Sequence, residues 1–179
     1  MTETKEPRLA PLPSDEWDDF LQRLVDATPG GRDRPLNIFT TLGRDPNLFR
    51  RWIGFGNALL NGRIPDRSRE LVILRVAHLT ESEYEWAQHV PTATAAGVTA
   101  EEIEALGRAL DRHPWPDEDK ALLKVADELD FLGFLEDETW NEAHAVLGDA
   151  GVIELLMLVG QYQMVAMLLR TLRVRLEGG

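Results

Sequence analysis

The stretch RSRELVILRVAHLTESEYEWAQHVPTATAAG, residues 67–97, organises the rest of the chain. Its apolar spacing predicts two consecutive helices that meet near position 80. Ser82, Glu85 and His89 follow one another at spacings of three and four residues, which places them on one face of the second helix. Glu70 lies on the first helix within its apolar stripe. A carboxylate on a face that should be buried needs a partner or a shifted pKa.

These four residues can support acid/base chemistry. His89 can donate or accept a proton near neutral pH, and a carboxylate beside it favours the imidazolium form, a competent general acid. Glu85, one turn earlier, and Glu70, on the neighbouring helix, are the candidate carboxylates. Ser82 can donate a hydrogen bond to a substrate oxygen. We therefore predict His89, Glu85, Glu70 and Ser82 as the catalytic residues.

Neighbouring side chains are candidates for substrate binding. Arg67 and Arg75, together with Arg69, can hold a substrate carboxylate because a guanidinium binds it through two parallel hydrogen bonds. Tyr84 and Trp86 can line a pocket near the histidine.

Each assignment has a purely structural alternative. Glu85 and His89 can form an exposed pair one turn apart, which stabilises a helix only weakly. Glu70 can form an internal salt bridge to an arginine, and Ser82 can serve only as a hydroxyl at a helix start. Trp86 falls at the spacing of a core residue. These alternatives stay open at the level of the sequence.

The same residues resemble a known family. Eleven, two and three residues separate Glu70, position 82, position 85 and His89. This is the active-site spacing of the AhpD-like alkylhydroperoxidases, within the carboxymuconolactone decarboxylase superfamily. The flanking text RSRELVILRVA and YEWAQHVPTA is also similar to this superfamily. In the peroxidase branch positions 82 and 85 are cysteines, whereas here they are Ser82 and Glu85. The chain thus resembles the cysteine-free branch.

The resemblance implies an all-helical bundle, a homo-oligomer (dimer, trimer or hexamer), and active-site roles for the residues on the matching positions. The chain has no cysteine, so thiolate catalysis and disulfides are excluded. We expect a cofactor-free enzyme of the carboxy-lyase type that acts on a small carboxylated substrate such as a lactone. The alternatives are an antioxidant peroxidase, against which the missing cysteines argue, and a non-catalytic binding or assembly protein.

Composition narrows the possible partners. Of the 179 residues, 44% are apolar, and the net charge is −12. An acidic chain is unsuited to nucleic acid or to an anionic membrane surface. Di-iron centres need a Glu-x-x-His pair from each of two helices. Glu85 and His89 are instead four residues apart and have no second copy, so we expect no metal site and no cofactor. The amino-terminal residues lack the apolar segment of a secretory signal, and the expected location is the cytoplasm.

The chain in order predicts an all-α, single-domain protein. Residues 1–13 contain three prolines and are expected to form an extended arm, and residues 14–179 are expected to form the helical domain. Ser14 is the predicted cap of the first helix. Thr99 and Glu102 form a capping-box pattern. A helix to Leu147, ended by Gly148, and a final apolar helix from Gly151 to about Leu176 complete the prediction.

Overall fold

A computed structural model describes residues 6–178 of the protein, and within this range the regular structure is entirely helical. Two short 3₁₀-helices cover Ser14–Glu16 and Leu110–Arg112. The α-helices are α1 (Asp19–Asp26), α2 (Asn37–Leu42), α3 (Pro46–Leu60), α4 (Asp66–Leu79), α5 (Glu83–Ala95), α6 (Ala100–Leu106), α7 (Asp117–Leu132) and α8 (Asp137–Leu172). The all-α prediction is confirmed.

The chain divides into two compact units. Unit 1 contains residues 1–57 and 168–179, and unit 2 contains residues 58–167. Of the predicted arm, residues 6–13 form no helix and belong to unit 1, while residues 1–5 lie outside the described residues.

Unit 1 is held together by aromatic side chains. Phe49 on α3 lies at the centre of a cluster in which Phe20, Phe39 and Trp52 all approach its ring, with centroids 5.8–6.0 Å away. The predicted cap of the first helix is wrong by four residues. The Asp18 carboxylate accepts a hydrogen bond from the backbone N–H of Leu21, and this caps α1.

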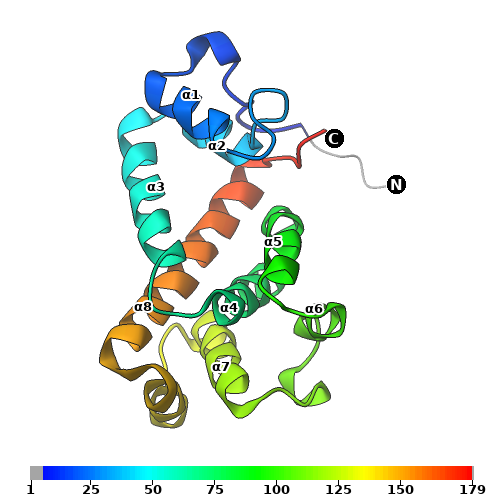
Figure 1. Cartoon of the computed structure of the whole chain (residues 1–179), viewed down its shortest axis with the longest axis vertical. Coiled ribbons are helices and arrows are strands. Elements are labelled where there is room, and N and C mark those ends of the chain that lie inside the picture. Colours follow the sequence, from blue (N-terminus) through cyan, green and yellow to red (C-terminus); the bar gives the residue numbers. More distant parts are fainter. Residues whose placement is uncertain (1–5, 179) are drawn as a thin grey trace. The chain divides into compact units, whose positions relative to one another are not determined.

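Unit 2 is built around α4, which is buried from Arg69 to Ala77. This helix packs against α5, α6 and α7 (Figure 1). One side of it contributes Val72, Ile73 and Val76 to a core shared with α7 and α8. Another side contributes Leu71 and Leu74 to a second cluster with residues of α5, α6 and α7. A helix buried on nearly every side explains why the stretch quoted above determines the fold of this unit.

Local signals set most helix boundaries in unit 2. The predicted capping box is present, with Thr99 accepting from the Glu102 N–H and the Glu102 carboxylate accepting from the Thr99 N–H. Gly133 ends α7 in the left-handed conformation, with φ 80°.

The last helix differs from the prediction at its end. Gly148 interrupts α8 with φ 65° and ψ −179°, so its two parts correspond to the two predicted helices. However, α8 ends at Leu172 rather than near Leu176, because Arg173 takes a left-handed φ of 57°. Arg173 and Arg175 therefore lie beyond the end of the helix.

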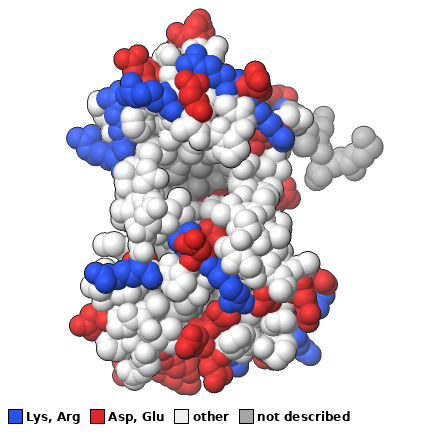
Figure 2. Space-filling model, viewed as in Figure 1, with Lys and Arg blue, Asp and Glu red and all other residues white. Residues whose placement is uncertain are grey.

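By length and composition α8 could cross a membrane, although the core helix of a soluble protein passes the same test. In its most apolar window, 44% of the residues are buried within the protein. On the face drawn in Figure 2, acidic and basic side chains are interleaved, and acidic side chains form a dense cluster over part of unit 2.

Candidate active site

A tight connection between α4 and α5 brings the predicted catalytic residues together. Glu81 adopts a left-handed φ of 52°. The N–H of Glu81 donates to the carbonyl of His78, and the N–H of Ser82 donates to the carbonyl of Ala77. These two bonds form a Schellman motif that ends α4 and starts α5 almost at once. The chain reverses there, and α5 packs along α4.

Glu70 and His89 form the central pair of the site. The Glu70 Oε2 lies 2.8 Å from the Nδ1 of His89. The Glu70 side chain is 1% exposed and that of His89 is 19% exposed. A carboxylate that binds Nδ1 orients the ring and leaves Nε2 to exchange a proton with a substrate.

Arg69 balances part of the charge of this pair. Its Nε lies 3.6 Å from Glu70 Oε1, and its terminal nitrogen contacts Asp66 at 2.9 Å. Glu70 therefore has the internal arginine contact that the structural alternative predicted, and it contacts His89 as well.

Glu85 is a buried carboxyl group without a basic partner. It is 3% exposed, and neither of its oxygens has a hydrogen-bond partner among the described residues. Burial raises the pKa of Glu85 to about 8, and the nearby Ser82 hydroxyl opposes that shift. Glu85 is thus mostly protonated at neutral pH. The alternative of an exposed Glu85–His89 pair is wrong, because Glu85 is buried and Glu70 is the carboxylate that contacts His89.

Tyr162, which the sequence analysis did not identify, completes the site from α8. Its ring stands nearly perpendicular to the imidazole of His89, with centroids 5.1 Å apart. Burial and the charges of Glu70 and Glu85 raise the pKa of its hydroxyl above the usual range. A signal was present in the sequence, because the polar run GQYQ interrupts an otherwise apolar helix.

The predicted substrate-binding arginines have other partners. Arg67 forms ion pairs with Asp119, at 2.7 Å, and with Glu102. Arg75 is buried and binds both carboxylate oxygens of Asp127, at 2.5 and 2.8 Å. It also donates to two carbonyl groups, those of Leu106 and Arg108. These contacts link α4 to its neighbours, so the prediction that Arg67 and Arg75 anchor a substrate carboxylate is not supported by their positions.

The two aromatic residues that were predicted to bind substrate are also packed within unit 2. Tyr84 is buried, and Trp86 packs against the cluster that includes Leu71 and Leu74. The Trp86 ring faces His78 at 6.5 Å, whereas the aromatic ring that faces His89 belongs to Tyr162. Within residues 6–178, no group of three or more His, Asp or Glu side chains is arranged to hold a metal ion.

Comparison with known proteins places this arrangement in a family. The family model described as "Carboxymuconolactone decarboxylase family" matches residues 46–128, a range that contains Glu70, Ser82, Glu85 and His89. Residues 46–128 are thus similar to the carboxymuconolactone decarboxylase family. The fold is that of the AhpD-like members of this superfamily, and the chain has no cysteine. A search of the curated proteins finds no match.

Solved structures share the fold at low sequence identity. A peroxidase-related protein from Ralstonia eutropha, described as an alkylhydroperoxidase AhpD core, is 14% identical with a TM-score of 0.84, covering 97% of this chain and 95% of its own. A peroxidase-related protein from Silicibacter sp. is 16% identical with a TM-score of 0.82, covering 98% and 94%. The debrominase Bmp8, bound to 2,3,4-tribromopyrrole, is 14% identical with a TM-score of 0.76, covering 95% and 91%.

Proposed function

We propose that this carboxymuconolactone decarboxylase-family protein is a cofactor-free acid/base enzyme of the carboxy-lyase type, acting on a small carboxylated substrate such as a lactone. The observation that supports this most is the Glu70–His89 pair, at 2.8 Å, beside the buried and mostly protonated carboxyl of Glu85. A carboxylate that binds the imidazole and a second carboxyl group that holds its proton near neutral pH form an arrangement suited to acid/base catalysis.

His89 supplies the proton in this proposal. When the bond to the departing CO2 breaks, its electron pair stays on the substrate. That pair takes the proton from Nε2 of the imidazolium, which becomes neutral imidazole. Glu70, bound to Nδ1, stabilises the imidazolium before the transfer and keeps the ring oriented.

The charges around the pair favour an anionic substrate. Below pH 8 the Glu85 carboxyl is mostly neutral, and the raised pKa of Tyr162 keeps its hydroxyl neutral too. Arg69 lies beside Glu70 and offsets its charge. The site therefore adds little negative charge that would repel a substrate carboxylate.

Two other functions are alternatives for a protein of this fold. A thiol peroxidase needs a cysteine to form its intermediate, and this chain has none. The debrominase activity of Bmp8 shows that proteins of this fold carry more than one chemistry. In a non-catalytic binding protein, the Glu70–His89 pair would have no catalytic role.

The decisive experiment measures CO2 release from a panel of small carboxylated lactones. We expect the wild type to release CO2 from at least one member, and His89→Ala to lose this activity by about a hundredfold or more. His144→Ala is the matched control, because His144 is exposed and pairs with Asp149 instead. Circular dichroism confirms that each variant is folded. Activity retained in His89→Ala contradicts the proposed proton donor, and no release from any lactone contradicts the carboxy-lyase assignment.

We also propose that the protein is a homo-oligomer that binds neither nucleic acid nor membranes. The net charge of −12 supports the exclusion of nucleic acid, and an exposed apolar stripe on α8, described in the Discussion, supports self-association.

A further inference from the structure

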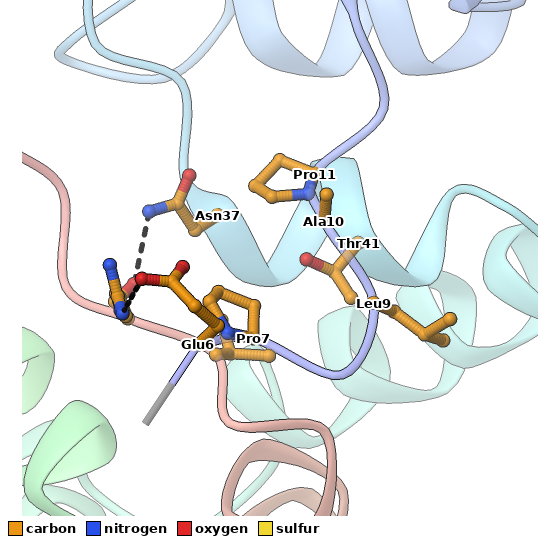
Figure 3. A pocket seen from close by; sticks show the side chains of 9 residues that line it. Glu6, Pro7, Leu9, Ala10, Pro11, Asn37 and Thr41 are labelled. Carbon is orange, nitrogen blue, oxygen red and sulfur yellow. Dashed lines mark hydrogen bonds and ion pairs between the residues drawn. The ribbon is translucent and has the colours of Figure 1, made fainter. Parts of the chain in front are cut away.

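Unit 1 contains a cavity of about 300 Å³ that lies outside the unit holding the Glu70–His89 pair. Three segments enclose it: the amino-terminal arm, α2 and the residues that follow α8 (Figure 3). Its lining is about evenly divided between polar and apolar groups, and consists of Glu6, Pro7, Leu9, Ala10, Pro11, Asn37, Thr41, Val174 and Arg175. This volume is at the small end of the range for ligand pockets.

The walls of the cavity are held in place by hydrogen bonds to backbone carbonyl groups. The N–H of Arg8 donates to the carbonyl of Leu172 at 2.9 Å, and the N–H of Leu12 donates to the carbonyl of Thr40 at 3.0 Å. The Asn37 side-chain amide donates to the carbonyl of Arg175 at 3.0 Å. The cavity is therefore formed before any ligand arrives, which lowers the cost of binding.

Thr41 presents an unused polar group to this cavity. The residue is 2% exposed, and its hydroxyl has no hydrogen-bond partner among the described residues. In Figure 3 the hydroxyl oxygen of Thr41 is directed into the cavity. A buried hydroxyl without a partner costs stability, so it is a feature that a ligand could satisfy.

Arg175 carries the positive charge of the cavity and binds a carboxylate within the protein. Its guanidinium lies 3.1 Å from Oε1 of Glu6. Glu6 is 86% exposed, and an ion pair of such an exposed side chain contributes little free energy. A carboxylate with additional contacts in the cavity can displace it.

We propose that this cavity is a second ligand site, which binds a small organic carboxylate with an apolar body. The ligand carboxylate replaces Glu6 at Arg175. Its body rests on the apolar wall formed by the prolines of the arm and by Leu9, which is otherwise 42% exposed. The hydroxyl of Thr41 hydrogen-bonds a polar atom of the ligand. The site is independent of the proposed lyase activity.

Calorimetric titration with benzoate tests this proposal, with benzyl alcohol as the uncharged probe of similar size. We expect benzoate to bind the wild type and benzyl alcohol to bind at least about tenfold more weakly. Arg175→Gln should lower the affinity for benzoate by about tenfold or more. Glu6→Gln should raise it, because one carboxylate that competes for the Arg175 guanidinium is gone. These opposite effects distinguish this cavity from other anion sites.

Two further variants make the result specific. Thr41→Val conserves shape and should weaken binding of 3-hydroxybenzoate, which carries a polar atom on its apolar body, by about fivefold to tenfold, the worth of one hydrogen bond. His89→Ala should leave benzoate affinity unchanged, because that residue belongs to the other unit. Thermal melts confirm folding of each variant. The proposal is overturned if benzoate does not bind, if Arg175→Gln binds as well as the wild type, or if His89→Ala abolishes binding.

Discussion

Glu85 shows how the chemistry of one residue depends on what surrounds it. The group is 3% exposed and its oxygens have no hydrogen-bond partner among the described residues, so burial dominates and its pKa rises from 4.5 to about 8. Glu70 is buried equally deeply, but it contacts both His89 and Arg69. Two carboxyl groups from adjacent helices therefore differ in the partners available to them.

Glu85→Gln should become more stable than the wild type as the pH rises, because only the wild type loses stability. The folded protein holds the Glu85 proton up to about pH 8, while the unfolded chain releases it near pH 4.5. Stability of the wild type should thus fall between these values by up to about 1.4 kcal/mol per pH unit, and glutamine removes this dependence. Urea denaturation of both proteins from pH 5 to 8 measures the difference.

Glu83→Gln is the control for this experiment, because Glu83 lies on the same helix and is exposed. The free energy of unfolding of Glu83→Gln should differ from that of the wild type by the same amount at every pH. If the free energy of unfolding of Glu85→Gln also differs from that of the wild type by a constant amount, Glu85 is ionised in the folded protein. The proposal that Glu85 holds a proton beside the Glu70–His89 pair then fails.

At the scale of the elements, α5 is joined to its neighbours by two tight connections of the same kind. Glu81 precedes it in a left-handed conformation, and Gly97, with φ 93°, follows it. The N–H of Val98 donates to the carbonyl of Ala93, as in the Schellman motif at the end of α4. These connections fix both ends of the helix that carries Glu85 and His89.

Gly97→Ala should destabilise the protein by about 1–2 kcal/mol, because an L side chain is strained at its positive φ. Gly54→Ala, on α3, is the matched control. A methyl group meets no atom within 4 Å at either position, so only the backbone conformation differs. Gly54→Ala should instead gain up to about 1 kcal/mol from helix propensity. Chemical denaturation measures both, and equal effects would show that φ is not the cause.

The loop between α3 and α4 is anchored by Glu154 of α8. The carboxylate accepts from the N–H of Arg63, at 2.8 and 2.9 Å, and from the N–H of Ile64, at 3.0 Å. A Cβ on Gly62 would lie 2.1 Å from the same carboxylate, which explains the glycine there.

Glu154→Ala should cost about 1.5–3 kcal/mol of stability, because it removes charge-assisted hydrogen bonds to two backbone groups. Glu142 lies on the same helix as Glu154. Glu142→Ala removes a partly exposed ion pair with Lys124 of α7 and should cost less than about 1 kcal/mol. Urea midpoints compare the two variants. A Glu154→Ala protein no less stable than Glu142→Ala would show that the anchor contributes little.

At the scale of the whole molecule, α8 exposes an apolar stripe. Ile153, Met157, Gly160, Met164 and Met167 follow one another at spacings of three and four residues, and all are exposed. The four apolar side chains are 39–60% exposed. An apolar stripe of this period is typical of a helix that packs against another helix, and it supports the proposed homo-oligomer.

Met157→Glu should therefore reduce the oligomer mass, because it places a charge in the middle of the stripe. Light scattering after size exclusion should give a multiple of 20.2 kDa for the wild type and a smaller multiple for the variant. Ala100→Glu, which adds the same charge at an exposed position of α6, is the control. A monomeric wild type would contradict the proposed assembly.

Much of the fold could be predicted from the sequence because its signals are local. Apolar spacing predicted the helices, and the Thr99–Glu102 pattern predicted a capping box that the structure contains. Errors occurred where neighbouring residues compete for one role. Asp18 rather than Ser14 caps α1, and Arg173 ends α8 earlier than expected, because such choices depend on a few dihedral angles and on the residues packed nearby.

The sequence by itself determined the helical class, the absence of thiol chemistry and the four positions of the candidate site. Only the tertiary structure decided which carboxylate binds His89, which aromatic ring faces it, and that Arg67 and Arg75 have carboxylate partners on α6 and α7. The physical reason is that helix periodicity is a property of neighbouring residues. Burial and ion pairing are instead settled between residues far apart in the chain, by how the helices pack.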